Sequence, residues 1–339
     1  MKKHTVIGVD LAKQSFALVE LKPNGQDGWR KTLRRSQVLR FLARQPCCTV
    51  ALEACAGAHY WGRQIQAFGH EVQILPPQHV KACLRGQKND YNDAWAIAET
   101  CHNGRVRTVR VKTVEQQDQQ LLIQQRRQLI GEQVRLGNQI RALLMEYGLV
   151  LAKGKASLAR IPELLEDGEN ELGPLSRQIL QRQYRRWRAL REELAWYDRE
   201  LKTQAKADDT CCRLSELPGF GPIVSQVFKG WIGDGKQLKR GRDASAALGL
   251  VPRQHSTGGR HVLLGISKRG DRYVRATVIH GARSVVQRAT RKEDALSRWI
   301  NRLVQTRGYN KAVVALANKL VRMAWVIVAR GERYRPAVV

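Results

Sequence analysis

TVIGVDLAKQSFALVEL, residues 5–21, is the stretch that decides the fold of the N-terminal part of the chain. Thr5–Val9 is a short apolar run that ends at Asp10, and Ser15–Leu21 alternates between apolar and polar residues. Apolar runs and alternations of this length are typical of β-strands. The stretch therefore predicts two strands, with a carboxylate at the end of the first.

The residues that follow extend this pattern into a sheet with helices. Three further strands and three helices are predicted over Trp29–Leu33, Ser36–Arg44 (capped by Ser36), Thr49–Leu52, Gly57–Phe68, Glu71–Leu75 (stopped by Pro76 and Pro77) and Tyr91–His102. Three strands in a row, followed by strands that alternate with helices, predict a mixed α/β sheet.

The middle of the chain is predicted to be helical. Two stripes of large apolar residues recur every seven positions: Leu122, Leu129, Leu136 and Leu143, then Leu180, Trp187, Leu194 and Leu201. Such stripes indicate a helical hairpin or coiled coil. Arg126 and Gln133 interrupt the seam, so packing within one subunit and an oligomer seam are equally good interpretations.

The last part opens with LPGFGP, residues 217–222, and continues through a Gly-rich basic stretch to two terminal helices, Arg272–Thr290 and Lys311–Ala329. Charge and periodicity thus divide the chain into an α/β domain over 1–111, a coiled-coil helical hairpin over 112–207, and a mainly helical domain over 208–339.

The net charge indicates a polyanionic partner. The chain carries 59 Lys and Arg against 30 Asp and Glu, a formal charge of +29, and residues 208–339 contribute +16 of it. A compact fold with this excess repels itself unless a polyanion binds. No apolar run appears long enough for a spanning helix, which argues against a membrane. No C-x-x-C motif is present, and a disulfide framework is not expected at this length, so we predict a cytoplasmic protein with reduced cysteines and without zinc.

Four acids form the strongest chemical pattern. Asp10 and Glu53 end predicted strands, and Asp90 and Asp93 are spaced to share one face of a predicted helix. Carboxylates gathered in one cavity repel unless cations lie between them, and oxygen ligands suit Mg²⁺ or Mn²⁺. Metal ions held in this way assist phosphodiester chemistry. Singly, each acid is equally typical of a turn or of the first turn of a helix.

These residues resemble a known family. GVDLAK at 8–13, EACAGAHYWGRQ at 53–64 and KNDYNDAWAIAE at 88–99 resemble the DEDD transposases of insertion sequences, which are related to Piv/MooV-type DNA invertases. ALGLVPRQHSTGGR at 247–260, LGISKRGDRYVR at 264–275 and VALANKLVRMAW at 314–325 agree with this. The resemblance implies a RuvC-like (RNase H-like) domain, a coiled coil and a C-terminal transposase domain. It also implies a prokaryotic, nucleoid-associated recombinase that acts on donor and target DNA, guided by a noncoding bridge RNA.

Ser256 is the candidate nucleophile. The resemblance implies that it attacks a DNA phosphate and forms a covalent serine–DNA link, while Thr257 and His255 remain alternatives as the neighbouring hydroxyl and an assisting base. Gly258 and Gly259 allow close approach of the backbone to phosphate. The LPGFGP turn resembles the hairpin of helix-hairpin-helix modules, although a plain turn between helices fits equally well. Predicted nucleic-acid contacts are Lys88, Gly219, Gly221, Arg253, Gly258, Gly259, Arg260, Lys268, Arg269, Arg272 and Arg275.

Two other functions are compatible with part of this pattern. A RuvC-like junction resolvase would share the acids but form no covalent intermediate, and a non-catalytic nucleic-acid-binding protein would not account for the four acids. The 163 positions between Asp93 and Ser256 include the long helical hairpin. This spacer predicts a homo-oligomer, dimer or tetramer, that shares its active sites between subunits, although the hairpin could also return the chain to its own carboxylates.

Overall fold

The computed structural model describes residues 4–87, 89–104 and 106–336. The chain forms two compact units, Met1–Asp118 and Gln119–Val339, which are described separately here. The division into three domains stays a prediction.

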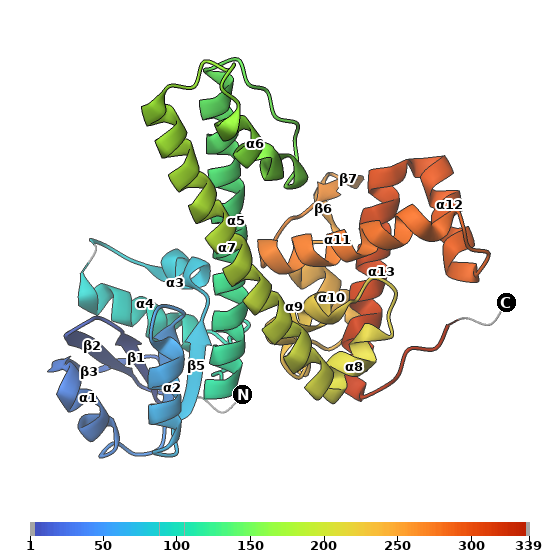
Figure 1. Cartoon of the computed structure of the whole chain (residues 1–339). Coiled ribbons are helices and arrows are strands. Elements are labelled where there is room, and N and C mark those ends of the chain that lie inside the picture. Colours follow the sequence, from blue (N-terminus) through green and yellow to red (C-terminus); the bar gives the residue numbers. More distant parts are fainter. Residues whose placement is uncertain (1–3, 88, 105, 337–339) are drawn as a thin grey trace. The chain divides into compact units, whose positions relative to one another are not determined.

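The first unit is built on a five-stranded mixed sheet with the order β3-β2-β1-β4-β5 (Figure 1). Its strands are β1 (Val6–Asp10), β2 (Ser15–Leu21), β3 (Asp27–Arg34), β4 (Thr49–Glu53) and β5 (Glu71–Leu75). The first three are antiparallel, whereas β4 runs parallel to β1 and β5 parallel to β4. The predicted mixed sheet is confirmed, with strand ends within two residues of those predicted.

Helices cover both faces of this sheet. On one face, α1 (Arg35–Leu42) and α2 (Ala58–Gln66) bury Val38, Leu42, Trp61 and Ile65 against the strands. On the other face, α3 (Pro77–Cys83) and α4 (Asp90–His102) pack through Val80 and a row of small residues of α4. Because successive strand residues point to opposite faces, each buried strand contributes to both cores.

The second unit begins with a long helical hairpin. The helices α5 (Val114–Met145) and α7 (Pro174–Ala207) form it, and η1 (Ala156–Arg160) and α6 (Ile161–Glu166) lie between them in the chain (Figure 1). Leu129 and Leu136 of the first predicted stripe and Leu180, Trp187 and Leu194 of the second share one core. The stripes therefore pack against each other within this chain.

The two polar interruptions of the seam differ in their surroundings. The Arg126 guanidinium donates to Asp198 of α7 over 2.6 Å and to the Tyr273 hydroxyl over 3.0 Å, so it ties α5 to two other helices. Gln133 is almost fully buried, and its amide has no hydrogen-bond partner among the described residues.

The rest of the second unit is a helical domain packed around its last helix. Its elements are α8 (Asp209–Ser215), α9 (Pro222–Ile232), α10 (Gly241–Ala247), β6 (Pro252–Thr257), β7 (Arg260–Ile266), α11 (Arg272–Ala289), α12 (Ala295–Arg307) and α13 (Tyr309–Arg330). The turn predicted at residues 217–222 and the helices over Arg272–Ala289 and Tyr309–Arg330 are confirmed. Neither α12 nor the strand pair β6–β7 was predicted, and β6–β7 lies in the stretch that was described only as Gly-rich and basic.

By length and composition α13 meets the criterion for a membrane-spanning helix, contrary to the expectation that no such run exists. Half of its apolar window is buried inside the structure, and Leu316, Leu320 and Val321 lie in the core of the second unit. Burial of this kind is typical of a core helix, so the length and composition of α13 are weak evidence that it crosses a membrane.

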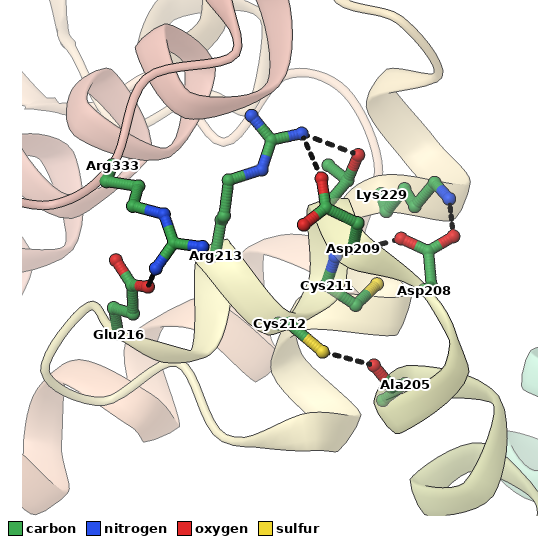
Figure 2. Close-up of polar contacts among 10 residues, drawn as sticks. Ala205, Asp208, Asp209, Cys211, Cys212, Arg213, Glu216, Lys229 and Arg333 are labelled. Carbon is green, nitrogen blue, oxygen red and sulfur yellow. Dashed lines mark hydrogen bonds and ion pairs between the residues drawn. The ribbon is translucent and has the colours of Figure 1, made fainter.

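Polar contacts fix the start of α8 (Figure 2). The Asp208 carboxylate accepts from the Cys211 amide as the N-cap of α8, and it pairs with Lys229 of α9. Burial raises the pKa of Asp208, but the Lys229 ammonium and the Cys211 amide outweigh it, so the pKa lies below its usual value. Arg333, beyond α13, pairs over 3.2 Å with Glu216, the residue that follows α8, and so ties the C-terminal segment to the end of this helix.

All seven cysteines are free thiols. Burial raises the pKa of Cys48 to about 11 and the pKa of Cys101 and of Cys211 to about 12. Cys47 in the first unit and Cys212 in the second are exposed.

Candidate functional site

Two of the four acids lie at the ends of neighbouring parallel strands. In β1 and β4, Val9 is the register partner of Leu52, so Asp10 and Glu53 follow at equivalent positions on the same edge of the sheet. Both residues are half-buried, unlike the fully buried residues that precede them. Both acids end neighbouring strands, as predicted, and their role as metal ligands stays a prediction.

The third element of this site is the first turn of α4. Asn89 caps the helix, since its side chain accepts from the Asn92 amide over 2.8 Å. The helix crosses β1 very closely: a Cβ at Gly8 would lie 2.3 Å from the Ala94 carbonyl oxygen and 2.8 Å from the Ala98 Cβ. Gly8 thus allows α4 to pack directly over the strand that ends in Asp10.

Asp93, one residue before Ala94, is half-buried, and its charge acts on Glu53. Burial and the charge of Asp93 both raise the pKa of Glu53 above its usual value. Burial and the charges of Glu53 and Asp10 raise the pKa of the Cys55 thiol. The fold therefore places Asp10 and Glu53 on one edge of the sheet, with Asp93 close enough for its charge to act on Glu53. Asp90 is exposed one helical turn before Asp93, and none of the described contacts links it to the other three.

The chemistry of this site suits a divalent cation, because a positive ion would relieve the repulsion that Asp93 exerts on the Glu53 carboxylate. Within residues 4–87, 89–104 and 106–336, however, no three His, Cys, Asp or Glu side chains are close enough to hold a metal ion together. The strand ends and the start of α4 place the acids in the same part of the first unit, but their side chains do not converge on one point.

Ser256 lies on an exposed β-hairpin. β6 and β7 are antiparallel, and a two-residue turn of Gly258 and Gly259 joins them, with φ of 54° and 78°. Turns with two positive φ values match the twist of paired strands and favour glycine. The glycines therefore have a structural role in the turn, independent of any phosphate.

The hairpin sorts the side chains near Ser256 onto two faces. Ser256 is the register partner of His261, and partners point to the same face of a strand pair. Gln254 shares this face, donating to the Ser256 hydroxyl over 2.9 Å, and its amide nitrogen is 3.5 Å from the His261 Nδ1. Thr257 and His255 project from the opposite face. His261, which the sequence did not suggest, is therefore better placed than His255 to act on Ser256.

Exposed cations flank the hairpin. Arg253 and Arg260 lie on its strands, and Lys268, Arg269 and Arg272 follow it, all exposed. Arg275 does not belong with them. Its guanidinium is buried and donates to the carbonyl oxygens of Leu248 and Arg269 over 3.1 and 2.7 Å, so it orders the chain around the hairpin instead of facing a ligand. Lys88 lies outside the described residues.

The two glycines of the LPGFGP turn also differ. Gly219 has a φ of 82°, and a Cβ there would lie 2.6 Å from the carbonyl oxygen of Gly281 in α11. Close packing on α11 explains this glycine without a phosphate. Gly221 is exposed at the start of α9, with open space around it.

Comparison with known proteins identifies relatives over the whole chain. A DEDD transposase family model (IS110) matches residues 7–149, and a model described as the transposase IS116/IS110/IS902 family matches residues 211–298.

Three curated relatives are similar over nearly their full length. The transposase for insertion sequence element IS1111A of Coxiella burnetii is 40% identical over 99% of this chain and 92% of the relative. A probable family 20 transposase of Pseudomonas aeruginosa is 40% identical over 97% and 98%. The transposase for insertion sequence element IS1328 of Yersinia enterocolitica is 38% identical over 98% of both chains.

Proposed function

The chain belongs to the IS110/IS116 family of insertion-sequence transposases, enzymes of DNA strand transfer, and from this premise we propose that it cuts and rejoins DNA through a covalent link to Ser256. The reaction, in this proposal, draws on two sets of residues: the carboxylates of the first unit and the hydroxyl of the β6–β7 hairpin. Donor and target DNA are the substrates, and the enzyme works as a homo-oligomer in the bacterial cytoplasm.

The carboxylates are proposed to bind Mg²⁺ or Mn²⁺. Asp10, Glu53 and Asp93 would hold the ion, and Asp90 would join them as a fourth ligand from the same helix face. When bound, the metal would stabilise the charge that develops on phosphate oxygens. The raised pKa of Glu53 supports this assignment, because a cation relieves the repulsion from Asp93. The sheet order, with helices on both faces, is consistent with an RNase H-like domain.

In the strand-transfer step, the Ser256 Oγ attacks the phosphorus of a DNA phosphodiester. The Oγ–P bond forms as the bond to the leaving deoxyribose oxygen breaks, and the serine proton leaves to a base while the leaving oxygen gains a proton. Attack by the hydroxyl of a second strand on the same phosphorus then releases Ser256 and rejoins the DNA. The net change exchanges one phosphodiester for another and consumes no cofactor.

His261 and the exposed arginines support this chemistry. His261 on the face of Ser256 is the candidate proton acceptor, and the exposed cations that follow the hairpin, Arg269 and Arg272, are the candidates to neutralise the attacked phosphate, since Arg260 pairs with Thr257 on the opposite face. Selection of donor and target sites is proposed to come from a bridge RNA that pairs with both DNAs, an assignment that rests on the family resemblance.

A single observation carries the choice of nucleophile: Ser256 is exposed and shares its hairpin face with Gln254 and His261, whereas Thr257 faces away. The test is a denaturing gel of the protein incubated with labelled donor DNA, guide RNA and Mg²⁺. Ser256→Ala should lose the protein–DNA adduct and keep nucleic-acid binding, while Thr257→Ala should keep the adduct. An adduct that disappears only with Thr257→Ala would move the role to that hydroxyl, and cleavage without any adduct would favour a junction resolvase.

A further inference from the structure

A cavity in the second unit is lined by residues other than the carboxylates of the first unit and the residues of the β6–β7 hairpin. Its volume is about 680 Å³, and α10, α12 and α13 form its walls. This volume falls within the roughly 300–1,000 Å³ range of small-molecule sites. None of the lining residues belongs to the β6–β7 hairpin or to the basic segment that follows it.

The lining is cationic. Six of its residues are basic, namely Lys239, Arg240, Arg242, Lys319, Arg322 and Arg330, and none is acidic. Among the ion pairs of the described residues, only Arg330 of this set has a carboxylate partner, Glu332 at 3.9 Å. Cations gathered in one hollow raise each other's energy unless an anion neutralises them. The cavity therefore suits a polyanion.

Close packing of α10 on α13 creates this concentration of charge. A Cβ at Gly241 would lie 2.8 Å from the Arg322 carbonyl oxygen, so only glycine lets the two helices approach at this point. The approach places Arg240 and Arg242 beside Arg322. Along α13, Ala315, Lys319, Arg322 and Val326 recur at three- and four-residue spacing and so share one face of the helix.

Aromatic and apolar side chains complete the lining. Trp325 is buried, and its indole nitrogen donates to the Gly235 carbonyl oxygen over 3.0 Å, which fixes one wall. Trp299 is half-buried, and the Lys319 ammonium lies 4.7 Å from its ring centroid. A simple inorganic anion would bind to the cations alone and would make no contact that requires an aromatic ring. An aromatic ring beside phosphate-binding groups is the arrangement that binds the base and the backbone of an unpaired nucleotide.

We propose that this cavity binds an unpaired nucleotide of a nucleic-acid strand, with its base against Trp299 and its phosphates on Lys319, Arg322 and Arg240. A duplex cannot place a base against Trp299, because its bases are already stacked on each other. This inference deepens the proposed function, since it assumes a nucleic-acid partner, but it does not require that Ser256 be the nucleophile.

The test measures binding alone, with the full-length protein and fluorescent ten-nucleotide strands of uridine, thymidine or abasic deoxyribose, and a 20-base-pair duplex. Trp299→Leu keeps apolar bulk but removes the ring, so the uridine or thymidine strand should bind roughly 5- to 150-fold more weakly. The abasic strand and the duplex should bind as before. Trp299→Phe should restore most of the affinity, which separates loss of stacking from loss of the fold.

The charges are tested through the salt dependence of binding. Lys319→Ala/Arg322→Ala should lower the slope of log affinity against log salt by about 1.4 for a single strand, or about 0.7 for each lost contact. The matched control is Arg302→Ala/Arg307→Ala, which removes two exposed charges from α12 outside the cavity and should leave the slope unchanged.

Weakened binding of the RNA strand, the DNA strand or both by these variants supports the site and identifies the strand that it holds. Equal weakening of the abasic strand by Trp299→Leu, or a control slope that falls as far as the cavity slope, overturns the proposal. The proposed function is tested separately, by the loss of the protein–DNA adduct in Ser256→Ala. This variant should retain wild-type binding in every one of the present measurements, so the two proposals can fail independently.

Discussion

Glu53 is the residue at which folding and chemistry oppose each other. Burial and the negative charge of Asp93 disfavour its ionised form, so its pKa lies above that of the unfolded chain. A carboxyl group with a raised pKa in the folded state reduces stability as the pH rises from the unfolded value through the folded value. At neutral pH, without a metal ion, ionised Glu53 is therefore a destabilising group in its unit.

We predict that Glu53→Gln raises the Tm of the metal-free protein at neutral pH by a small amount and abolishes strand transfer. Calorimetry at pH 4 and pH 7.5 checks this, and the gain should appear only at the higher pH. Added Mg²⁺ should stabilise the wild type more than the variant, because the variant lacks a ligand. A Tm that is lower than that of the wild type at pH 7.5 would show that Glu53 stabilises the metal-free fold.

For single residues, the positions of the acids at strand ends and at a helix start were predictable, whereas the surroundings of Ser256 and Arg275 were not. Asp10, Glu53 and Asp93 were recognisable because each follows or begins a regular apolar pattern. Nothing in the sequence distinguishes His261 from His255, since the difference depends on the register of a strand pair. Arg275 was misassigned because arginine is usually exposed, and its burial depends on two carbonyl groups that only the folded chain brings to it.

Among the elements, β1 and α4 depend on one glycine. A methyl group at position 8 would overlap the Ala94 carbonyl, so α4 must move away from the strand. We predict that Gly8→Ala destabilises the first unit by about 1–3 kcal/mol, the usual cost of overpacking, and sharply lowers strand transfer because Asp93 moves with the helix.

Thermal unfolding and a strand-transfer assay check this prediction. Gly168→Ala is the matched control, because a Cβ at that position meets no atom within 4 Å. Wild-type stability and activity in Gly8→Ala would mean that the helix adjusts to the methyl group without moving its acids.

The start of α8 gives a prediction about acid stability. The folded-state pKa of Asp208 is lowered, so its contribution to stability is present above the unfolded pKa and is lost as the pH falls through the folded value. Asp208→Ala should cost about 1 kcal/mol at neutral pH through loss of the cap, and less under acidic conditions. Asp208→Asn should keep the cap but lose the pair with Lys229.

Urea unfolding at pH 7 and at pH 3 measures both effects. The control is Asp209→Asn, whose carboxylate is largely exposed and pairs with Arg213 over 3.0 Å, an arrangement that contributes little. A cost for Asp208→Ala that is the same at both pH values would show that ionisation of the side chain is irrelevant to the cap.

Elements were predictable where their apolar pattern is strong and local. Ser15–Leu21 and Glu71–Leu75 match the predicted strands to the residue, and α4 begins one residue before its predicted start. The hairpin β6–β7 was missed because nearly all of its residues are exposed, which leaves no buried face to read in the sequence. The helix α12 was missed although its apolar residues, Leu296, Trp299, Ile300, Leu303 and Val304, recur at helical spacing.

For the whole molecule, the separation of acids and hydroxyl along the chain leads to a complementation experiment. Ser256→Ala protein and an Asp10→Asn/Asp93→Asn double variant should each be inactive in strand transfer. If subunits share their sites, mixed oligomers contain some intact pairs of residue sets, and activity should partly return. The assay compares equimolar mixtures with each variant alone.

Formation of mixed oligomers must be verified with two different affinity tags. If they form and no strand transfer returns at any ratio, each subunit uses its own carboxylates with its own serine.

The charge of the molecule was predictable from composition, as was a nucleic-acid partner. The expectation that no apolar run is long enough to span a membrane was wrong, because α13 is long and apolar, and its apolar residues lie in the core.

The distribution of thiols makes the chain suitable for fluorescent labelling after two substitutions. The thiolate is the form that reacts with maleimides, and Cys48, Cys101 and Cys211 stay protonated near neutral pH because of their raised pKa. Cys47 and Cys212 are exposed, one on each unit. Once Cys55 and Cys83 are replaced by serine, a donor and an acceptor dye on these two positions would allow energy transfer to report the distance between the two units in single molecules, with and without DNA.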